Sequence, residues 1–173
     1  MEQAPTYSLS GESSPTVDLT PLGPLLPLTD AVDHGLDVKS RAVLPAAVRP
    51  AFLEGGFLTM WVGPCVAAFP ATSFTTWVDR IRGQLATSGF DDPAAHVRYV
   101  HARSARFRPD LQGRFVLPDR FREAAGIERE VTVVGVGDRV ELWDTATYGR
   151  DLDELEQNIS FLQSTYDLPE VGA

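Results

Sequence analysis

The sequence has one cysteine, three histidines and no long apolar run among its 173 residues. A single cysteine, Cys65, excludes an intramolecular disulfide, and its apolar surroundings from Phe57 to Phe69 predict a buried thiol in a reducing compartment. No uncharged apolar run reaches the roughly 18 residues that a membrane span needs. The first residues lack the basic region and apolar core of a signal peptide. We therefore expect a cytoplasmic protein without a membrane partner.

The chain also lacks the residue patterns of catalysis and of metal binding. It contains no Ser-His-Asp or Cys-His arrangement and no glycine-rich loop of the kind that cradles phosphates. His96 and His101 are five positions apart, which does not place them on one helical face, and no neighbouring cysteine or acid cluster has metal-ligand spacing. We therefore expect no enzymatic activity, no cofactor, no metal and no small-molecule substrate.

The formal net charge of −9 argues against a nucleic-acid partner only until its location is considered. Residues 1–30 contain four acids and no Lys or Arg, and residues 138–173 contain nine acids and two arginines. Between Arg98 and Arg122 there are seven arginines and only two acids. The acidity thus lies at the ends, and the body keeps a basic stretch. Its arginines at 98, 103, 106 and 108 are interpreted as a solvated helix face, with an added basic surface as the alternative.

Composition divides the chain into four parts. Residues 1–29 are rich in proline, which predicts a flexible leader; its leucines leave open that the end of the leader docks on a neighbour. Residues 30–90 and 91–160 are expected to form two halves of similar organisation, the second with a connecting helix. Residues 161–173 are expected to be a C-terminal tail.

The main feature of the sequence is a repeated motif. Residues 37–45 and residues 110–118 both read Asp-x-x-small-Arg-x-Val-Leu-Pro. The correspondence continues beyond the motif: Arg49 falls on Arg122 at the same separation of 73 residues. With one inserted residue, Gly63 then corresponds to Gly137. Two copies of a unit of about fifty residues indicate two similar halves in one body rather than a solenoid.

Each half is predicted to contain a strand, a short helix, a β-hairpin and a longer helix, which makes the fold class α+β. Pairing of the halves in a closed or interleaved barrel would remove exposed sheet edges. The tryptophans at 61, 77 and 143 are expected to pack in the core, and His34 to lie in a loop. In the first half we expect a strand at 41–44, a helix from Pro45, a hairpin of 57–62 and 66–69, and a helix from Thr72. In the second half we expect a connecting helix capped by Asp91 and Asp92, strands at 106–108 and 115–117, a helix at 118–125, a hairpin of 130–136 and 139–143, and a helix at 145–163 after Asp144.

The motif itself has two interpretations. In the structural one, the aspartate side chain caps a tight turn, Gly113 supplies backbone freedom, and the arginine pairs with a nearby acid. In the functional one, the turn presents Lys39, Arg41 and Arg114 outward, where they can approach a phosphate backbone and a groove edge. Turn chemistry is common to many proteins, so spacing alone favours the structural interpretation.

The two motifs, the duplication and the run from Gly126 to Asp144 resemble the MraZ family, bacterial regulators of the division and cell-wall gene cluster that are related to AbrB-type DNA-binding domains. The resemblance covers about residues 33–160 and is strongest over residues 110–144. It implies two tandem pseudo-symmetric AbrB-like half-units in a swapped-hairpin-like β-barrel with flanking helices. It also implies a homo-oligomeric ring that binds repeats in promoter DNA.

The resemblance assigns roles to particular residues. The family's DNA-contacting positions fall on Lys39, Arg41 and Arg114, and its structural turn positions fall on Asp37, Ser40, Asp110 and Gly113. Ser40 stands where the family has glycine, so a different backbone conformation is expected in the first turn. Gln112 occupies a site where a basic residue would strengthen binding, and the Pro-rich leader replaces the family's short aromatic-glycine start.

The leading interpretation is therefore a sequence-specific, DNA-binding transcriptional regulator that assembles as a ring and is associated with the nucleoid. One alternative is a divergent relative that keeps the ring as a protein-interaction scaffold and has lost DNA binding. A further alternative is an antitoxin-like AbrB-type protein, although such proteins carry one copy of the motif. The two main interpretations differ in whether both turns project cations on the same face.

Overall fold

A computed structural model of the chain describes residues 28–88 and 92–166. The expected leader up to residue 27, Asp91 of the expected cap, and the tail from residue 167 lie outside the described residues. The strands are β1 (Ala31–Gly35), β2 (Arg41–Val43), β3 (Gly56–Met60), β4 (Cys65–Pro70), β5 (Ala105–Phe107), β6 (Arg114–Val116), β7 (Glu130–Gly135) and β8 (Val140–Asp144). The helices are η1 (Arg49–Phe52), α1 (Ala71–Thr87), α2 (Pro93–Arg103), α3 (Asp119–Ala124) and α4 (Thr145–Tyr166). The α+β class is confirmed.

Six strands form one antiparallel sheet in the order β1-β7-β8-β4-β3-β5, and β2 and β6 form a separate two-stranded ribbon. The sheet is open, so the expected barrel is wrong for the described residues. Strand β1 pairs only with β7 and strand β5 only with β3, which leaves each with a free edge. With three residues, β5 offers too few backbone groups to close the sheet against β1.

The connections between strands follow one rule on both sides of the sheet. The strand before the first motif, β1, pairs with the hairpin β7-β8 that follows the second motif. The strand before the second motif, β5, pairs with the hairpin β3-β4 that follows the first motif. The two hairpins meet in the middle of the sheet, where β4 pairs with β8 and Val66 lies opposite Leu142. Both parts of the chain therefore contribute to both sides of the sheet.

Strand β4 is buried along its whole length because it separates two apolar clusters. Val66 and Ala68 point into the main core with η1, α3 and the strands of the ribbon. Ala67 and Phe69 alternate to the other face and pack with Phe74 of α1. This period of two places a helix over each face of the strand. The tryptophans at 61, 77 and 143 all pack in these clusters or against the sheet, as expected.

Two helix starts have the capping geometry that the sequence predicts. Asp92 accepts a hydrogen bond from the backbone amide of Ala95 at 2.9 Å, and Asp144 accepts one from the amide of Thr147 at 3.0 Å. Each aspartate thereby satisfies an amide of the first turn that has no partner within the helix. The helices α2 and α4 begin directly after these residues.

Two local expectations are wrong. The helix expected from Pro45 is only the single 3-10 turn η1, because Pro50 has no N–H to donate within a longer α-helix. His34, expected in a loop, lies on β1 opposite Val131. The segment lacks a strong apolar alternation, but Val32 and His34 still face inward while Ala31 and Asp33 face solvent. The Nε2 atom of His34 is buried without a hydrogen-bond partner among the described residues.

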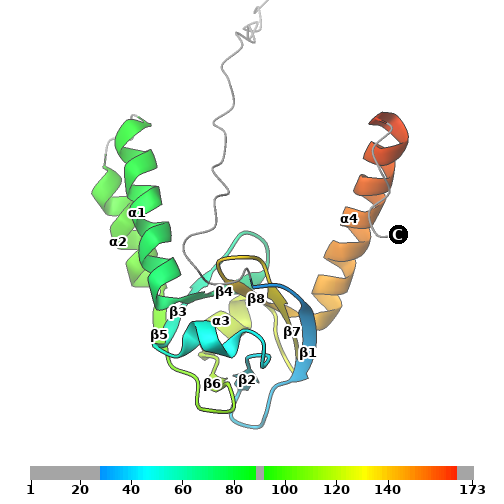
Figure 1. The fold of residues 1–173 in the computed structure, drawn as a ribbon, viewed down its shortest axis with the longest axis horizontal. Helices are drawn as coiled ribbons and strands as arrows, with labels where there is room; N and C mark the ends of the chain where they lie inside the picture. Colours follow the sequence, from blue (N-terminus) through cyan, green and yellow to red (C-terminus); the bar gives the residue numbers. More distant parts are fainter. Residues whose placement is uncertain (1–27, 89–91, 167–173) are drawn as a thin grey trace, which may run out of the picture.

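The elements are distributed over two ends of the molecule (Figure 1). The ribbon β2-β6 lies at one end, and the helices α1 and α2 on one side and α4 on the other extend beyond the opposite end. Leu28, the last leucine of the expected leader, is buried and exchanges two backbone hydrogen bonds with Gly137, so the end of the leader does dock on the sheet. No helix in the described residues is long and apolar enough to cross a membrane.

Candidate nucleic-acid interface

The first motif forms a tight turn around the carboxylate of Asp37. Its Oδ1 atom accepts hydrogen bonds from the backbone amides of Lys39 at 2.8 Å and Arg41 at 3.0 Å. Its Oδ2 atom accepts a bond from Nε of Arg41 at 2.6 Å. The turn closes where the amide of Ser40 donates to the carbonyl oxygen of Asp37 at 2.9 Å. The aspartate thus fixes both the backbone of the turn and the direction of the arginine.

The second motif repeats this arrangement. Oδ1 of Asp110 accepts from the backbone amides of Gln112 and Arg114, both at 2.9 Å. Oδ2 of Asp110 accepts from Nε of Arg114 at 2.8 Å. The amide of Gly113 donates to the carbonyl oxygen of Asp110 at 2.8 Å. The structural interpretation of the motif is therefore confirmed for both copies.

Ser40 does not give the first turn a different conformation, contrary to expectation. Its φ angle is 53°, in the same left-handed region as the 81° of Gly113. At Gly113 a side chain would be strained and would also collide, since a Cβ atom there would lie 2.6 Å from Nε of Arg49 and 2.7 Å from the carbonyl oxygen of Leu44. The turn conformation is the same in both copies, but serine adopts it at an energetic cost that glycine avoids.

The ribbon β2-β6 joins the two turns into one unit. Val43 lies opposite Arg114, and Arg41 lies opposite Val116. Beyond the strands, the amide of Leu44 donates to the carbonyl oxygen of Gly113 at 2.8 Å. The buried residues of the ribbon, Ala42 and Phe115, anchor it on the main core. The two turns therefore lie on the same end of the molecule (Figure 1).

The hydrogen bonds of the turns favour ionised carboxylates. The backbone amide of Arg41 lowers the pKa of Asp37 below its ordinary value of 3.8, with further lowering by the Arg41 guanidinium. The backbone amide and then the guanidinium of Arg114 lower the pKa of Asp110 in the same way. Both aspartates accordingly remain charged, and both turns remain intact, over the neutral pH range.

Each arginine is held by Nε alone, which leaves its terminal nitrogens without an acceptor among the described residues. The side chains of Arg41 and Arg114 are 36% and 41% exposed, so these donors face solvent. A guanidinium in this state can bind a phosphate or the O6 and N7 atoms of guanine. Lys39 is exposed beside them and adds a point charge. The structure thus brings together all three cations that the sequence singles out.

The tips of the turns carry a feature that sequence reasoning missed. Val38 and Leu111 occupy the same position in the two motifs and are 103% and 99% exposed. The signal was available in the motif, because its second position is apolar in both copies. Apolar tips beside fixed arginines can contact the methyl group of thymine.

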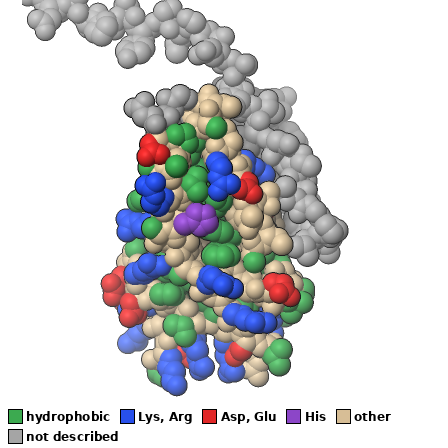
Figure 2. Space-filling model, turned by 90° about the vertical axis from the view of Figure 1, so that its left-hand side faces the viewer, with side chains coloured by type: hydrophobic (Ala, Val, Ile, Leu, Met, Phe, Trp, Pro, Cys, Tyr) green, Lys and Arg blue, Asp and Glu red, His purple; other side chains and the backbone are tan. Residues whose placement is uncertain are grey.

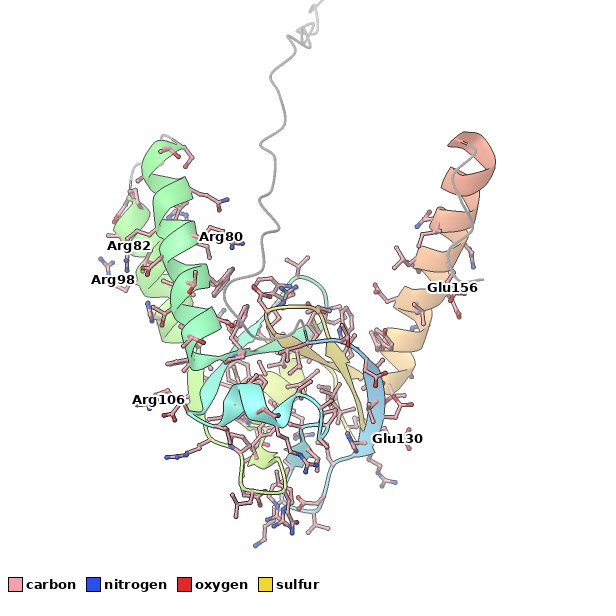
Figure 3. The ribbon with its side chains drawn as sticks, viewed as in Figure 1. Arg80, Arg82, Arg98, Arg106, Glu130 and Glu156 are labelled. Atoms are coloured by element: carbon pink, nitrogen blue, oxygen red, sulfur yellow. The ribbon has the colours of Figure 1, made fainter. Side chains whose placement is uncertain are left out.

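The remaining arginines of the basic stretch lie elsewhere. Arg98 and Arg103 are exposed on α2, at the other end of the molecule from the turns, and Arg106 lies at the base of that helix (Figure 3). They form a solvated helix face, as the sequence favoured, and do not extend the surface of the turns. Within the described residues, no group of three or more His, Cys, Asp and Glu side chains is arranged to hold a metal ion.

Comparison with known proteins connects this arrangement to one family. A family model described as "MraZ protein, putative antitoxin-like" matches residues 102–168. A "Transcriptional regulator MraZ" from Micrococcus luteus is 35% identical over 127 residues, which cover 72% of this chain and 86% of that protein. Proteins of the same name from Kineococcus radiotolerans and Acetivibrio thermocellus are 36% and 32% identical, over 70% and 66% of this chain and 83% and 79% of theirs.

Proposed function

The chain belongs to the MraZ family, and from this membership we propose that it binds double-stranded DNA at promoter repeats through its two Asp-x-x-small-Arg turns. Its relatives are named transcriptional regulators and not enzymes. The observation that carries the proposal is the pair of arginines, Arg41 and Arg114. Each is fixed by its aspartate through Nε and exposes its terminal nitrogens on the same end of the molecule.

Arg41 and Arg114 contact base edges or phosphates, and Lys39 contacts a phosphate. The aspartates Asp37 and Asp110 position the arginines and do not touch DNA. Fixing a guanidinium before binding reduces the side-chain entropy that binding would otherwise cost. One pair of turns carries few cations on a chain of net charge −9, so its affinity for DNA is low.

A ring of several copies overcomes this weakness. Turns presented to successive repeats of one DNA molecule bind with avidity, because each further contact becomes intramolecular. The repeated connectivity of the sheet supports two interleaved half-units, residues 30–90 and 91–160, as the source of the paired turns in each copy. The protein acts in the cytoplasm on the nucleoid, at the division and cell-wall gene cluster.

The test is a binding titration with DNA from upstream of the gene cluster that encodes the protein, at fixed salt, followed by fluorescence anisotropy. Arg114→Ala is expected to abolish binding with the oligomer intact. Arg150→Ala on α4 removes the same charge from an exposed site away from the turns and is expected to leave affinity unchanged. Wild-type affinity should fall steeply as salt rises.

Unchanged affinity of Arg114→Ala would exclude the turn as the DNA-binding site. A wild-type protein that assembles but binds no DNA at low salt would favour the alternative function, a protein-interaction scaffold.

A further inference from the structure

Helix α4 has almost no partner within its own chain. Only its first turns contact the body: Thr145 shares a hydrogen bond with Thr132 at 3.1 Å, and the ring of Tyr148 lies 6.0 Å from that of Trp143. Every side chain from residue 151 to residue 158 is exposed. An isolated helix of this length is marginally stable in water, and most helices gain their stability by packing an apolar face. Such a packing face is present on α4.

The apolar residues of α4 follow a regular spacing. Tyr148, Leu152, Leu155 and Ile159 are separated by four, three and four positions, which aligns them on one side of the helix. Leu152 is 38% exposed and Leu155 is 51% exposed. This stripe is flanked by the carboxylates of Asp151, Asp153, Glu154 and Glu156, against which the helix carries only one arginine. The surface of α4 therefore requires a partner that is both basic and partly apolar.

The other side of the molecule has this character. We call α1 and α2 together the helical arm. It carries arginines at 80, 82, 98 and 103 and one acid within the helices, Asp79. Figure 2 looks onto this side and shows Lys and Arg side chains interleaved with hydrophobic ones, with few acids between them. Figure 3 places Arg82, Arg98 and Arg106 along the outer edge of the arm.

Helix α2 supplies the apolar part of this surface. Tyr99 is 62% exposed beside Arg98. Ala94 and Ala102 are exposed on the same helix, and their small side chains allow the backbone of another helix to approach closely. The helical arm is thus complementary to α4 in charge, and it offers an apolar contact at the same place.

The two surfaces cannot meet within one copy, because the helical arm and α4 lie on opposite sides of the sheet (Figure 1). Both extend from the same end of the molecule, so the α4 side of one copy can lie against the arm side of a second. A contact between two different surfaces leaves each copy with one surface of each kind still open. Repetition of such a head-to-tail contact produces a ring when the rotation closes.

We propose that α4 of one copy packs against the helical arm of the next copy, with the stripe of Leu152 and Leu155 on α2 and the carboxylates of α4 against the arginines of the arm. The inference rests on the proposed function, whose ring it deepens by naming the two surfaces that form it. The turns of Asp37 and Asp110 lie at the other end of every copy and stay accessible to DNA.

The experiment is a pair of charge reversals followed by sedimentation velocity, without DNA. The acid-side variant is Glu154→Arg/Glu156→Arg, and the arm-side variant is Arg98→Glu/Arg103→Glu. Each variant alone is expected to lose the assembled species at micromolar concentration and to sediment near the 18.9 kDa of one chain. Glu130→Lys, a reversal on the exposed start of β7 away from both surfaces, is expected to sediment as the wild type.

Mixing provides the decisive arm of the experiment. An acid-side variant retains a basic arm and gains a basic α4, and an arm-side variant retains an acidic α4 and gains an acidic arm. An equimolar mixture restores opposite charges at every contact and is expected to recover the wild-type mass. Circular dichroism and the melting temperature of each variant show that the chains remain folded.

Three results would overturn the interface. These are a wild-type protein that sediments as one chain, an arm-side variant that keeps the wild-type mass, and folded variants that fail to assemble when mixed. Failure of the DNA-binding proposal gives a different pattern, since Arg114→Ala then leaves both DNA affinity and assembled mass unchanged while the charge reversals still dissociate the ring.

Discussion

The backbone amide of Leu117 donates a hydrogen bond to the carbonyl oxygen of Ser40 across 2.9 Å. The reciprocal bond runs from Leu44 to Gly113, at equivalent positions of the other motif. Each turn is therefore held in place by the residue that follows the strand of the other copy. The two turns form one cooperative unit, so a substitution that distorts one of them is expected to displace the other.

Exchange of the third-position residue tests this unit through stability. Ser40→Gly relieves the positive φ of a non-glycine residue, and we expect a gain of roughly 0.5–1 kcal/mol in the free energy of unfolding after the higher entropy of glycine in the unfolded chain is subtracted. Gly113→Ser introduces the same strain and a collision with Arg49 and Leu44, so a loss of about 2 kcal/mol or more is expected. Urea denaturation measures both. Equal stability of the two variants would contradict the geometry described for these turns.

The aspartates of the turns make stability depend on acid pH. The pKa of Asp110 is lowered in the folded state by the amide and guanidinium of Arg114, so its ionised form stabilises the fold. This contribution is fully present above the ordinary aspartate pKa of 3.8 and is lost as pH falls through the lower folded-state pKa. We expect Asp110→Asn to be less stable than the wild type at pH 7, with a difference that shrinks below pH 4.

The measurement is the free energy of unfolding as a function of pH for both proteins. Glu128→Gln removes a carboxylate from another exposed position and serves as the control. A constant difference between Asp110→Asn and wild type from pH 7 to pH 2.5 would show that ionisation of Asp110 does not support the turn.

The apolar tips are expected to contribute to DNA sequence discrimination. Val38 and Leu111 are almost completely exposed, and the proposed function places them against base edges beside Arg41 and Arg114. We expect Leu111→Ser to weaken binding to the promoter repeat about fivefold to tenfold, which corresponds to about 1–1.4 kcal/mol for a lost thymine-methyl contact. Affinity for unrelated DNA should not change. Equal weakening on both DNAs would instead indicate a general contact or a disturbed turn.

Local sequence signals predicted most of the elements, because each depends on neighbouring residues. Asp92 and Asp144 mark helix starts, and Gly63 with Pro64 marks the turn of a hairpin. The open sheet and the strand β1 were not predicted. Their pairing partners lie about a hundred residues away, as in the pair His34 and Val131, and a polar edge strand carries no strong periodic pattern.

The candidate site was predicted in its parts and not in its geometry. The motif identifies Asp37, Arg41, Asp110 and Arg114, since each turn is made by residues close in sequence. The effect of Ser40 was predicted wrongly, because glycine is preferred but not required at a positive φ when surrounding hydrogen bonds fix the backbone. The link between the two turns depends on the ribbon β2-β6, which joins residues about seventy positions apart.

A buried ion pair next to the second hairpin gives a last prediction, on stability. Glu141 is 9% exposed and accepts hydrogen bonds from two nitrogens of Arg139, the closer at 2.8 Å, and from the indole N–H of Trp143 at 3.2 Å. The guanidinium of Arg139 lies 4.3 Å from the ring centre of Trp61. Arg139→Met removes the partner and leaves a buried carboxylate, so a loss of about 3 kcal/mol in the free energy of unfolding is expected.

Glu141→Gln in the same chain removes the buried charge that makes Arg139→Met costly. We therefore expect the double variant to recover at least about 1 kcal/mol relative to Arg139→Met alone, a coupling that a double-mutant cycle in urea measures directly. Arg150→Met, a loss of an exposed arginine on α4, should change stability by less than about 0.5 kcal/mol. Additive losses from Arg139→Met and Glu141→Gln would mean that the two groups act independently, and that stacking of Arg139 on Trp61 accounts for its effect.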